Sequence, residues 1–133
     1  MNILDFMKHK HEVIFVYDCD TVEHAINLLS KERFTSIPIL SKEEKYVGTI
    51  SEGDLLYALY EFGRKGSANF KISEIHRHRD YQPVRITDPL VALIARASNE
   101  NFVPVVDDAD RFLGIVTRKR LLDYFFETKF VIL

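Results

Sequence analysis

Residues 36–54 read SIPILSKEEKYVGTISEGD, and residues 102–120 read FVPVVDDADRFLGIVTRKR. The two stretches align without a gap at an offset of 66. Each has an apolar run around a proline (Pro38, Pro104), a polar five-residue loop and a second apolar run with a glycine (Gly48, Gly114). So many matches at one spacing indicate a tandem duplication. The chain of 133 residues is therefore predicted to contain two copies of one supersecondary unit.

Each copy is predicted to contain its elements in the order β-α-β-β-α. The expected strands are 13–17, 37–40 and 46–50 in the first copy, and 83–86, 102–106 and 112–116 in the second. Asp20 with Glu23 three residues later predicts a capping box at the first helix, and Asp88 followed by Pro89 predicts the start of its counterpart. Because one such unit cannot bury all of its apolar surface alone, the copies are expected to pack sheet against sheet.

The domain boundaries follow from this duplication. We expect residues 1–62 to form the first repeat with an N-terminal linker segment, and residues 81–133 to form the second repeat with a C-terminal tail. Residues 63–80, which contain Gly63 and Gly66, are predicted to be a linker with one helical turn at 72–75. The apolar tail residues 131–133 are expected to dock on a core or to contribute to a dimer interface.

Composition excludes several classes of protein. A net charge of -2 argues against general binding to nucleic acid or to anionic membranes, which favour a basic excess. The single Cys19 cannot form an intramolecular disulfide, which fits a reducing cytoplasm. No apolar run is long enough for a signal peptide or a membrane span. We therefore expect a cytoplasmic protein with neither nucleic-acid nor membrane partners.

Each copy resembles the CBS (cystathionine-β-synthase) domain. The shared pattern is an apolar-Pro-apolar strand, then Gly-x-apolar-Ser/Thr, and then x-x-Asp at the start of a helix; here it comprises residues 37–39 with 48–54, and residues 103–105 with 114–120. The resemblance implies an α+β fold of tandem CBS domains with pseudo-two-fold symmetry and ligand clefts between the repeats. It also implies a homodimer and an adenosine-containing ligand such as AMP, ADP, ATP, S-adenosylmethionine, NAD or cyclic di-AMP.

Ser51 and Asp54 stand where the family has its ribose-binding hydroxyl and carboxylate. A carboxylate can accept hydrogen bonds from both vicinal ribose hydroxyls, which supports that role. The same spacing is also that of an ordinary helix capping box. The resemblance further implies a slot for adenine, formed by Asp20, Thr21, Val22, Ile37 and Ile39. For Ile37 and Ile39 the alternative role is simple burial in the core.

The second copy departs from the family pattern because Arg120 replaces the ribose carboxylate, and a guanidinium cannot accept hydrogen bonds. The three basic residues after Thr117 would lie at a helix N-terminus, where the helix dipole makes positive charge unfavourable. A bound anion would offset this cost, and the alternative is a solvated charge cluster. A second basic stretch, 77–79, lies 69 positions after residues 8–10. The residues predicted to hold phosphate are Arg77, Arg79, Thr117, Arg118, Lys119 and Arg120.

We find no catalytic set and no metal site in the sequence. His9 with His11, and His76 with His78, have i, i+2 spacing, but neither pair has a suitably placed third ligand. The sequence therefore predicts a non-enzymatic regulatory module that requires no cofactor. Its expected ligand in the inter-repeat cleft is AMP, ADP or ATP, and its expected partners are a second copy of the chain and an unidentified protein. The alternatives are a cyclic di-AMP receptor, or a dimerisation module with a vestigial nucleotide site.

Overall fold

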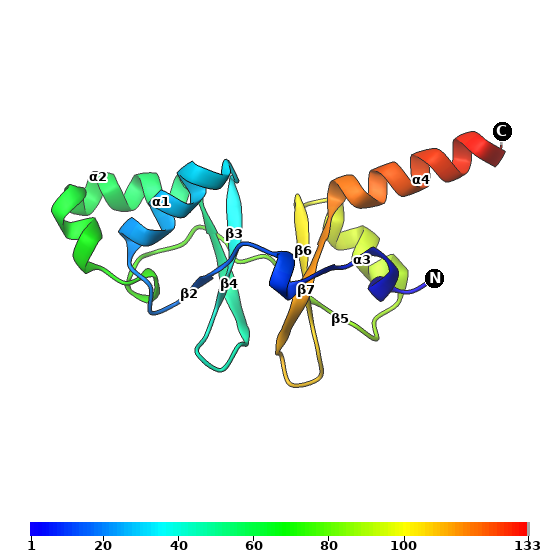
Figure 1. The fold of residues 1–133 in the computed structure, drawn as a ribbon, viewed down its shortest axis with the longest axis horizontal. Helices are drawn as coiled ribbons and strands as arrows, with labels where there is room; N and C mark the ends of the chain where they lie inside the picture. The colour runs from blue at the N-terminus through cyan, green and yellow to red at the C-terminus, as the bar shows by residue number, and fades with distance from the viewer. Residues whose placement is uncertain (133) are drawn as a thin grey trace. The chain divides into compact units, whose positions relative to one another are not determined.

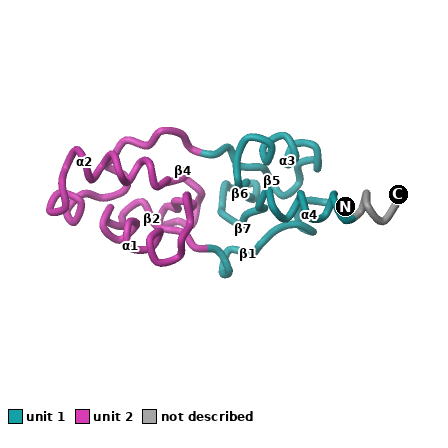
Figure 2. The backbone as a smooth tube through the Cα atoms, turned by 90° about the horizontal axis from the view of Figure 1, so that it is seen from above, with its two compact units in different colours: residues 1–13, 81–133 teal, residues 14–80 magenta. Residues whose placement is uncertain are grey.

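The computed structural model describes residues 1–132 and their side chains as far as Glu127. The side chains of the apolar tail 131–133 lie outside the described residues, so its predicted docking is not addressed. The chain forms two compact units, one of residues 14–80 and one of residues 1–13 with 81–133 (Figure 2). Four α-helices and two sheets among the described residues make the fold α+β, as predicted.

The unit of residues 14–80 contains a sheet with the strand order β2-β3-β4. Its elements are β2 (Val16–Tyr17), α1 (Val22–Glu32), β3 (Ser36–Leu40), β4 (Tyr46–Ser51), α2 (Glu52–Asn69) and the 3-10 turn η3 (Ile72–Glu74). Strand β2 is parallel to β3, which is antiparallel to β4. Helices α1 and α2 cover one face of this sheet (Figure 1). Helix α2 is interrupted at Gly63, whose φ of 72° is left-handed, and the predicted linker begins at this residue.

The other unit contains a four-stranded sheet in the order β1-β7-β6-β5. Its elements are η1 (Ile3–Phe6), β1 (Lys8–His9), η2 (Lys10–Glu12), β5 (Val84–Arg85), α3 (Leu90–Ala97), β6 (Phe102–Val106), β7 (Phe112–Thr117) and α4 (Arg118–Ile132). Strand β5 is parallel to β6, and β6 is antiparallel to β7. The N-terminal strand β1 adds an antiparallel edge to β7.

The duplication extends to strand register. Ile39 pairs with Gly48 in the first sheet, and Val105 pairs with Gly114 in the second. Each hairpin also shifts register immediately after that pair. The two prolines, at the centres of β3 and β6, oppose Thr49 and Ile115. The repeat read from the sequence is therefore a repeat of backbone geometry.

The segment before each repeat packs into the core of the other repeat. Ile72 and Ile75, from the stretch predicted as a linker, are buried in the core of residues 14–80. Ile3 and Phe6, 69 positions earlier, are buried in the core that contains the second repeat. The turn predicted at 72–75 is confirmed as η3. The core of residues 14–80 is thus completed by the segment that follows α2, and the core that contains the second repeat is completed by the N-terminal segment.

The predicted helix starts are wrong by one residue. Thr21 is the N-cap of α1, and its hydroxyl accepts the His24 amide at 3.1 Å. Pro89 occupies the N-cap of α3 instead of the first helical turn. Asp20 and Asp88 instead accept the amide three residues before them, at 2.8 and 2.9 Å. These carboxylates therefore stabilise the turn after β2 and after β5, because short acidic side chains compete as readily for a turn amide as for a helix amide.

Candidate functional site

A pocket of about 560 Å³ lies at the start of helix α2, within the unit of residues 14–80. This volume falls in the usual range for small-molecule sites, roughly 300–1,000 Å³. Its lining residues are Ser51, Gly53, Asp54, Tyr57, His76 and His78. The pair predicted for ribose, Ser51 and Asp54, is therefore found together at a concave surface.

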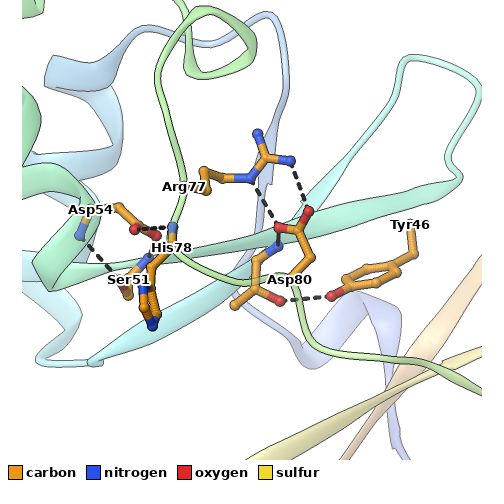
Figure 3. A network of polar contacts seen from close by, with 7 residues as sticks. Tyr46, Ser51, Asp54, Arg77, His78 and Asp80 are labelled. Atoms are coloured by element: carbon orange, nitrogen blue, oxygen red, sulfur yellow. Dashed lines mark hydrogen bonds and ion pairs between the residues drawn. The ribbon is translucent and has the colours of Figure 1, made fainter.

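Ser51 and Asp54 also form a complete capping box. The Ser51 hydroxyl accepts the Asp54 amide at 3.1 Å, and the Asp54 Oδ2 accepts the Ser51 amide at 3.0 Å (Figure 3). Both backbone groups belong to the first turn of α2, where they have no partner within the helix. The capping interpretation of this tetrapeptide is confirmed, and it coexists with a position in the wall of the pocket.

Asp54 has a second structural contact. Its Oδ1 accepts the backbone amide of His78 at 2.8 Å, and only 6% of the residue is exposed. The carboxylate therefore fastens the segment after η3 to the start of α2 (Figure 3). An ionised carboxylate offers about four acceptor positions, and two are used by backbone amides. Capacity for a ligand hydroxyl remains, but less than an unengaged carboxylate would have.

The segment 76–80 contributes two histidines to the pocket lining and an ion pair beside it. His76 and His78 line the pocket, whereas Arg77 donates from Nε and Nη2 to Asp80 at 3.0 and 3.1 Å. Asp80 also accepts the Thr49 amide of β4 at 2.9 Å. Partial burial acts to raise the pKa of Asp80, but the hydrogen bonds from the Arg77 guanidinium and the Thr49 amide outweigh it and hold that pKa below its usual value. Arg77, predicted to bind phosphate, is thus engaged outside the pocket lining.

Replacing Asp80 with asparagine is expected to lower stability at neutral pH but not in acid. Because the folded-state pKa of Asp80 is lowered, its ionised form stabilises the fold above the ordinary carboxyl pKa of about 3.9. That contribution is lost as pH falls through the lowered pKa. Urea unfolding of both proteins at a series of pH values from neutral into acid measures it, and the difference between the two stabilities should shrink as the pH falls. A difference that persisted unchanged in acid would rule out the charge of Asp80 as its cause.

The five residues predicted for an adenine slot lie elsewhere. Val22, Ile37 and Ile39 are buried in the core, so their side chains have the simple packing role. Asp20 closes the turn after β2 and Thr21 caps α1. None of the five is in the pocket lining that contains Ser51 and Asp54. The adenine contact of this set stays a prediction.

Three aromatic pocket residues were missed by the site prediction. Tyr57 lies three positions after Asp54, a spacing that places two side chains on one helix face. The sequence indicates His76 and His78 only as a possible metal pair, although their i, i+2 spacing also places both on one side of an extended segment. Only the return of this segment to α2 brings them to the pocket.

The second copy keeps the cap but uses its cations differently. The Thr117 hydroxyl accepts the Arg120 amide at 3.1 Å, which matches the Ser51 contact. The Arg118 Nε donates to the carbonyls of Ala97 and Glu100 at 2.8 and 3.2 Å, at the end of α3. Lys119 pairs with Asp123 at 3.1 Å. Cations near a helix C-terminus are favourable, so Arg118 has a structural reason to be basic without any bound anion.

The remaining predicted phosphate residues are Arg79 and Arg120. The Arg120 guanidinium lies 5.3 Å from the centroid of the Phe6 ring, a cation–π contact within its own unit. Arg79 is exposed on the segment that follows η3. Arg77 and Arg79 belong to one compact unit and residues 117–120 to the other. A joint role for these residues in phosphate binding stays a prediction.

Among residues 1–132, no helix is both long enough and apolar enough to cross a membrane. In the same part of the chain, no group of three or more His, Cys, Asp or Glu side chains is placed to hold a metal ion.

Comparisons with known proteins agree with this geometry. The chain is 28% identical to cyclic di-AMP receptor B of Bacillus subtilis (strain 168) over 121 residues, which are 88% of this chain and 81% of the receptor. The crystal structure of CbpB in complex with c-di-AMP matches with a TM-score of 0.85 and 26% identity, over 96% of this chain and 85% of that one. A CBS domain protein from Streptococcus pneumoniae TIGR4 matches with a TM-score of 0.82 and 26% identity, over 90% and 83% of the two chains.

A family model extends this likeness to both halves of the chain. The model of the CBS domain matches residues 3–61 and again residues 72–127. The two matches include the Pro38 and Pro104 strands, both central hairpins and the Ser51–Asp54 capping box. On this evidence the chain belongs to the CBS-domain family, with two such domains in tandem.

Proposed function

We propose that the chain is a non-catalytic regulatory module that binds an adenine nucleotide, and that cyclic di-AMP is its ligand. The observation that carries the proposal is the pocket at the start of α2, where Ser51 and Asp54 meet two histidines and a tyrosine. These two residues occupy the positions that the family resemblance implies for ribose. Similarity to a receptor and to a complexed protein whose names specify cyclic di-AMP supports the choice of ligand.

The state of Asp54 is compatible with cyclic di-AMP as well as with AMP, ADP or ATP. The sequence had favoured the mononucleotides because a free carboxylate suits two vicinal hydroxyls. Two of the acceptor positions of Asp54 are already used by the Ser51 and His78 amides. The acceptor positions that remain can serve two vicinal hydroxyls of a mononucleotide, and they can equally serve the single free 2′-hydroxyl of a ribose in cyclic di-AMP, whose 3′-oxygen is esterified.

Regulation requires that the ligand bind one conformation better than another. The pocket wall contains His76 and His78, and the same segment continues at Tyr81 into the other compact unit. A ligand held by this wall acts on the chain connection between the two units. We expect the change to be read through a homodimer or by a protein partner, and we expect the protein to be cytoplasmic.

The proposal predicts a selective thermal stabilisation by cyclic di-AMP. At about 100 times its dissociation constant a ligand adds about 2.7 kcal/mol, a shift of several degrees for a domain of this size. The screen includes AMP, ADP, ATP, NAD and S-adenosylmethionine, with calorimetry for each compound that shifts the transition. Tighter binding of a mononucleotide would reassign the ligand. Failure of every nucleotide to bind would favour the alternative of a dimerisation module with a vestigial site.

A further inference from the structure

Among its described lining residues, the pocket at the start of α2 has neither lysine nor arginine. Its lining contains one carboxylate, from Asp54, and the hydroxyls of Ser51 and Tyr57. Among the described residues of the lining, His76 and His78 are the side chains that can become cationic. A nucleotide brings negative phosphate oxygens to this wall. Charge-assisted hydrogen bonds are about twice as strong as neutral ones, so protonated imidazoles would be the preferred phosphate donors.

We infer that His76 and His78 are the phosphate-binding residues of this pocket, so that nucleotide binding takes up protons and strengthens as pH falls. This inference rests on the proposed function, and it assigns one chemical group of the ligand to each side of the pocket. Asp54 and Ser51 would face the ribose, and the imidazoles would face the phosphate. Neither histidine had been assigned a role in ligand binding from the sequence.

The main chain that carries the two histidines is anchored at His78. The His78 amide donates to Asp54 Oδ1 at 2.8 Å, which anchors the main chain between the two rings. The intervening Arg77 is turned away and paired with Asp80 at 3.0 Å, so its charge is already compensated. Both histidines are exposed and available to a ligand. A wall held in place before binding loses less conformational entropy when the ligand arrives.

The sign of the pH effect follows from the groups that surround the rings. The titratable groups that line the pocket with the two rings are Asp54 and Tyr57 on α2. The charged neighbours of the histidines along the chain are Arg77, Arg79 and Asp80, of which Arg77 and Asp80 are paired with each other. Phosphate oxygens interact more favourably with a protonated imidazole than with a neutral one, so phosphate binding and proton uptake favour each other. Affinity for a phosphate-containing ligand should therefore fall as the pH rises through the range in which imidazoles usually titrate. Each proton taken up changes affinity by at most about tenfold per pH unit.

The test is calorimetry of cyclic di-AMP binding between about pH 5.5 and about pH 8.5, the range in which imidazoles usually titrate. The phosphodiesters of this ligand keep a constant charge across that range, so a pH effect reports on the protein. Wild-type affinity is expected to fall at least about tenfold from acid to base. The double variant His76→Gln/His78→Gln should bind weakly with a flat pH profile. The double variant His76→Lys/His78→Lys should bind tightly with a flat profile, because an ammonium stays charged.

His9→Gln is the matched control, because His9 lies 69 positions before His78 in the equivalent segment and is also exposed. It should leave the profile of the wild type unchanged. All substituted positions are exposed, and thermal unfolding without ligand verifies that each variant folds. Cyclic di-AMP binding that is independent of pH and unaffected by both double variants would overturn this inference and leave the proposed function standing. No binding of cyclic di-AMP, AMP, ADP or ATP to the wild type would overturn both.

Discussion

Replacing Asp54 with alanine is expected to weaken nucleotide binding by roughly 10- to 100-fold, because a hydrogen bond to a charged group contributes about 1.5–3 kcal/mol. The same change removes the acceptor of two backbone amides, from Ser51 and His78. We therefore also expect a loss of about 1–3 kcal/mol in the free energy of unfolding. Calorimetry with cyclic di-AMP measures the first effect, and urea unfolding without ligand measures the second.

A pair of matched variants separates the two roles of this site. Ser51→Ala and Thr117→Ala each remove a hydroxyl that accepts a helix amide at 3.1 Å. Each should cost about 1 kcal/mol of stability, the usual value for a lost N-cap. Ser51 lines the pocket of residues 14–80, so only Ser51→Ala should also weaken binding. If both cap variants lost affinity equally, the weaker binding of Ser51→Ala would be a result of its lower stability and not of a lost ligand contact. Wild-type affinity in a folded Asp54→Ala variant would place the nucleotide elsewhere.

The parts of this fold that could be predicted from sequence are the elements that follow from short-range patterns of apolar residues. The strands around Pro38 and Pro104, and the strands that follow them, were predicted from apolar runs repeated at one offset. The helix starts were missed by one residue because Asp20 and Thr21 both have side chains able to cap. Only the backbone turn decides which one does so, and here Asp20 accepts the Tyr17 amide.

No local sequence pattern indicates that the segment before each repeat packs into the core of the other repeat. Ile3 and Ile72 occupy equivalent positions, but nothing near either residue in the sequence indicates which core receives it. For the same reason only part of the pocket could be predicted from sequence. Ser51 and Asp54 lie three residues apart and form a local motif, whereas His76 and His78 reach the pocket only because the segment returns to α2. Likewise, the carbonyls at the end of α3 that engage Arg118 lie about 20 residues before it in the chain.

Gly114→Ala is expected to produce the largest loss of stability among single substitutions of the glycines in the two sheets. A Cβ at this position would collide with the carbonyl oxygen of Lys8 and would lie 3.0 Å from the Met7 side chain. The carbonyl belongs to β1, which pairs with β7 at His9 and Gly114, so it cannot move without separating the strands. Overpacking of this kind costs about 1–3 kcal/mol, and urea unfolding measures it.

Gly48→Ala is the control at the equivalent position of the first repeat. Its Cβ would collide with the ends of the Asp80 and Arg77 side chains, which can rotate away at the expense of their ion pair. The Gly48 variant should therefore lose less stability than the Gly114 variant. Equal losses in the free energy of unfolding would mean that strand β1 moves away from the new methyl group as easily as the Asp80 and Arg77 side chains do.

A double-mutant cycle connects Gly114 to the core that the N-terminal segment completes. Phe6 is 4% exposed and packs against Tyr124 at a ring-centroid distance of 5.1 Å, so Phe6→Ala should cost about 3–5 kcal/mol. If Gly114→Ala acts by displacing β1, it releases the same Phe6 from its core. The losses in the double variant should then be less than additive. Full additivity would show that residues 3–6 stay docked when β1 leaves β7, and that the strand and the aromatic anchor stabilise the second repeat independently.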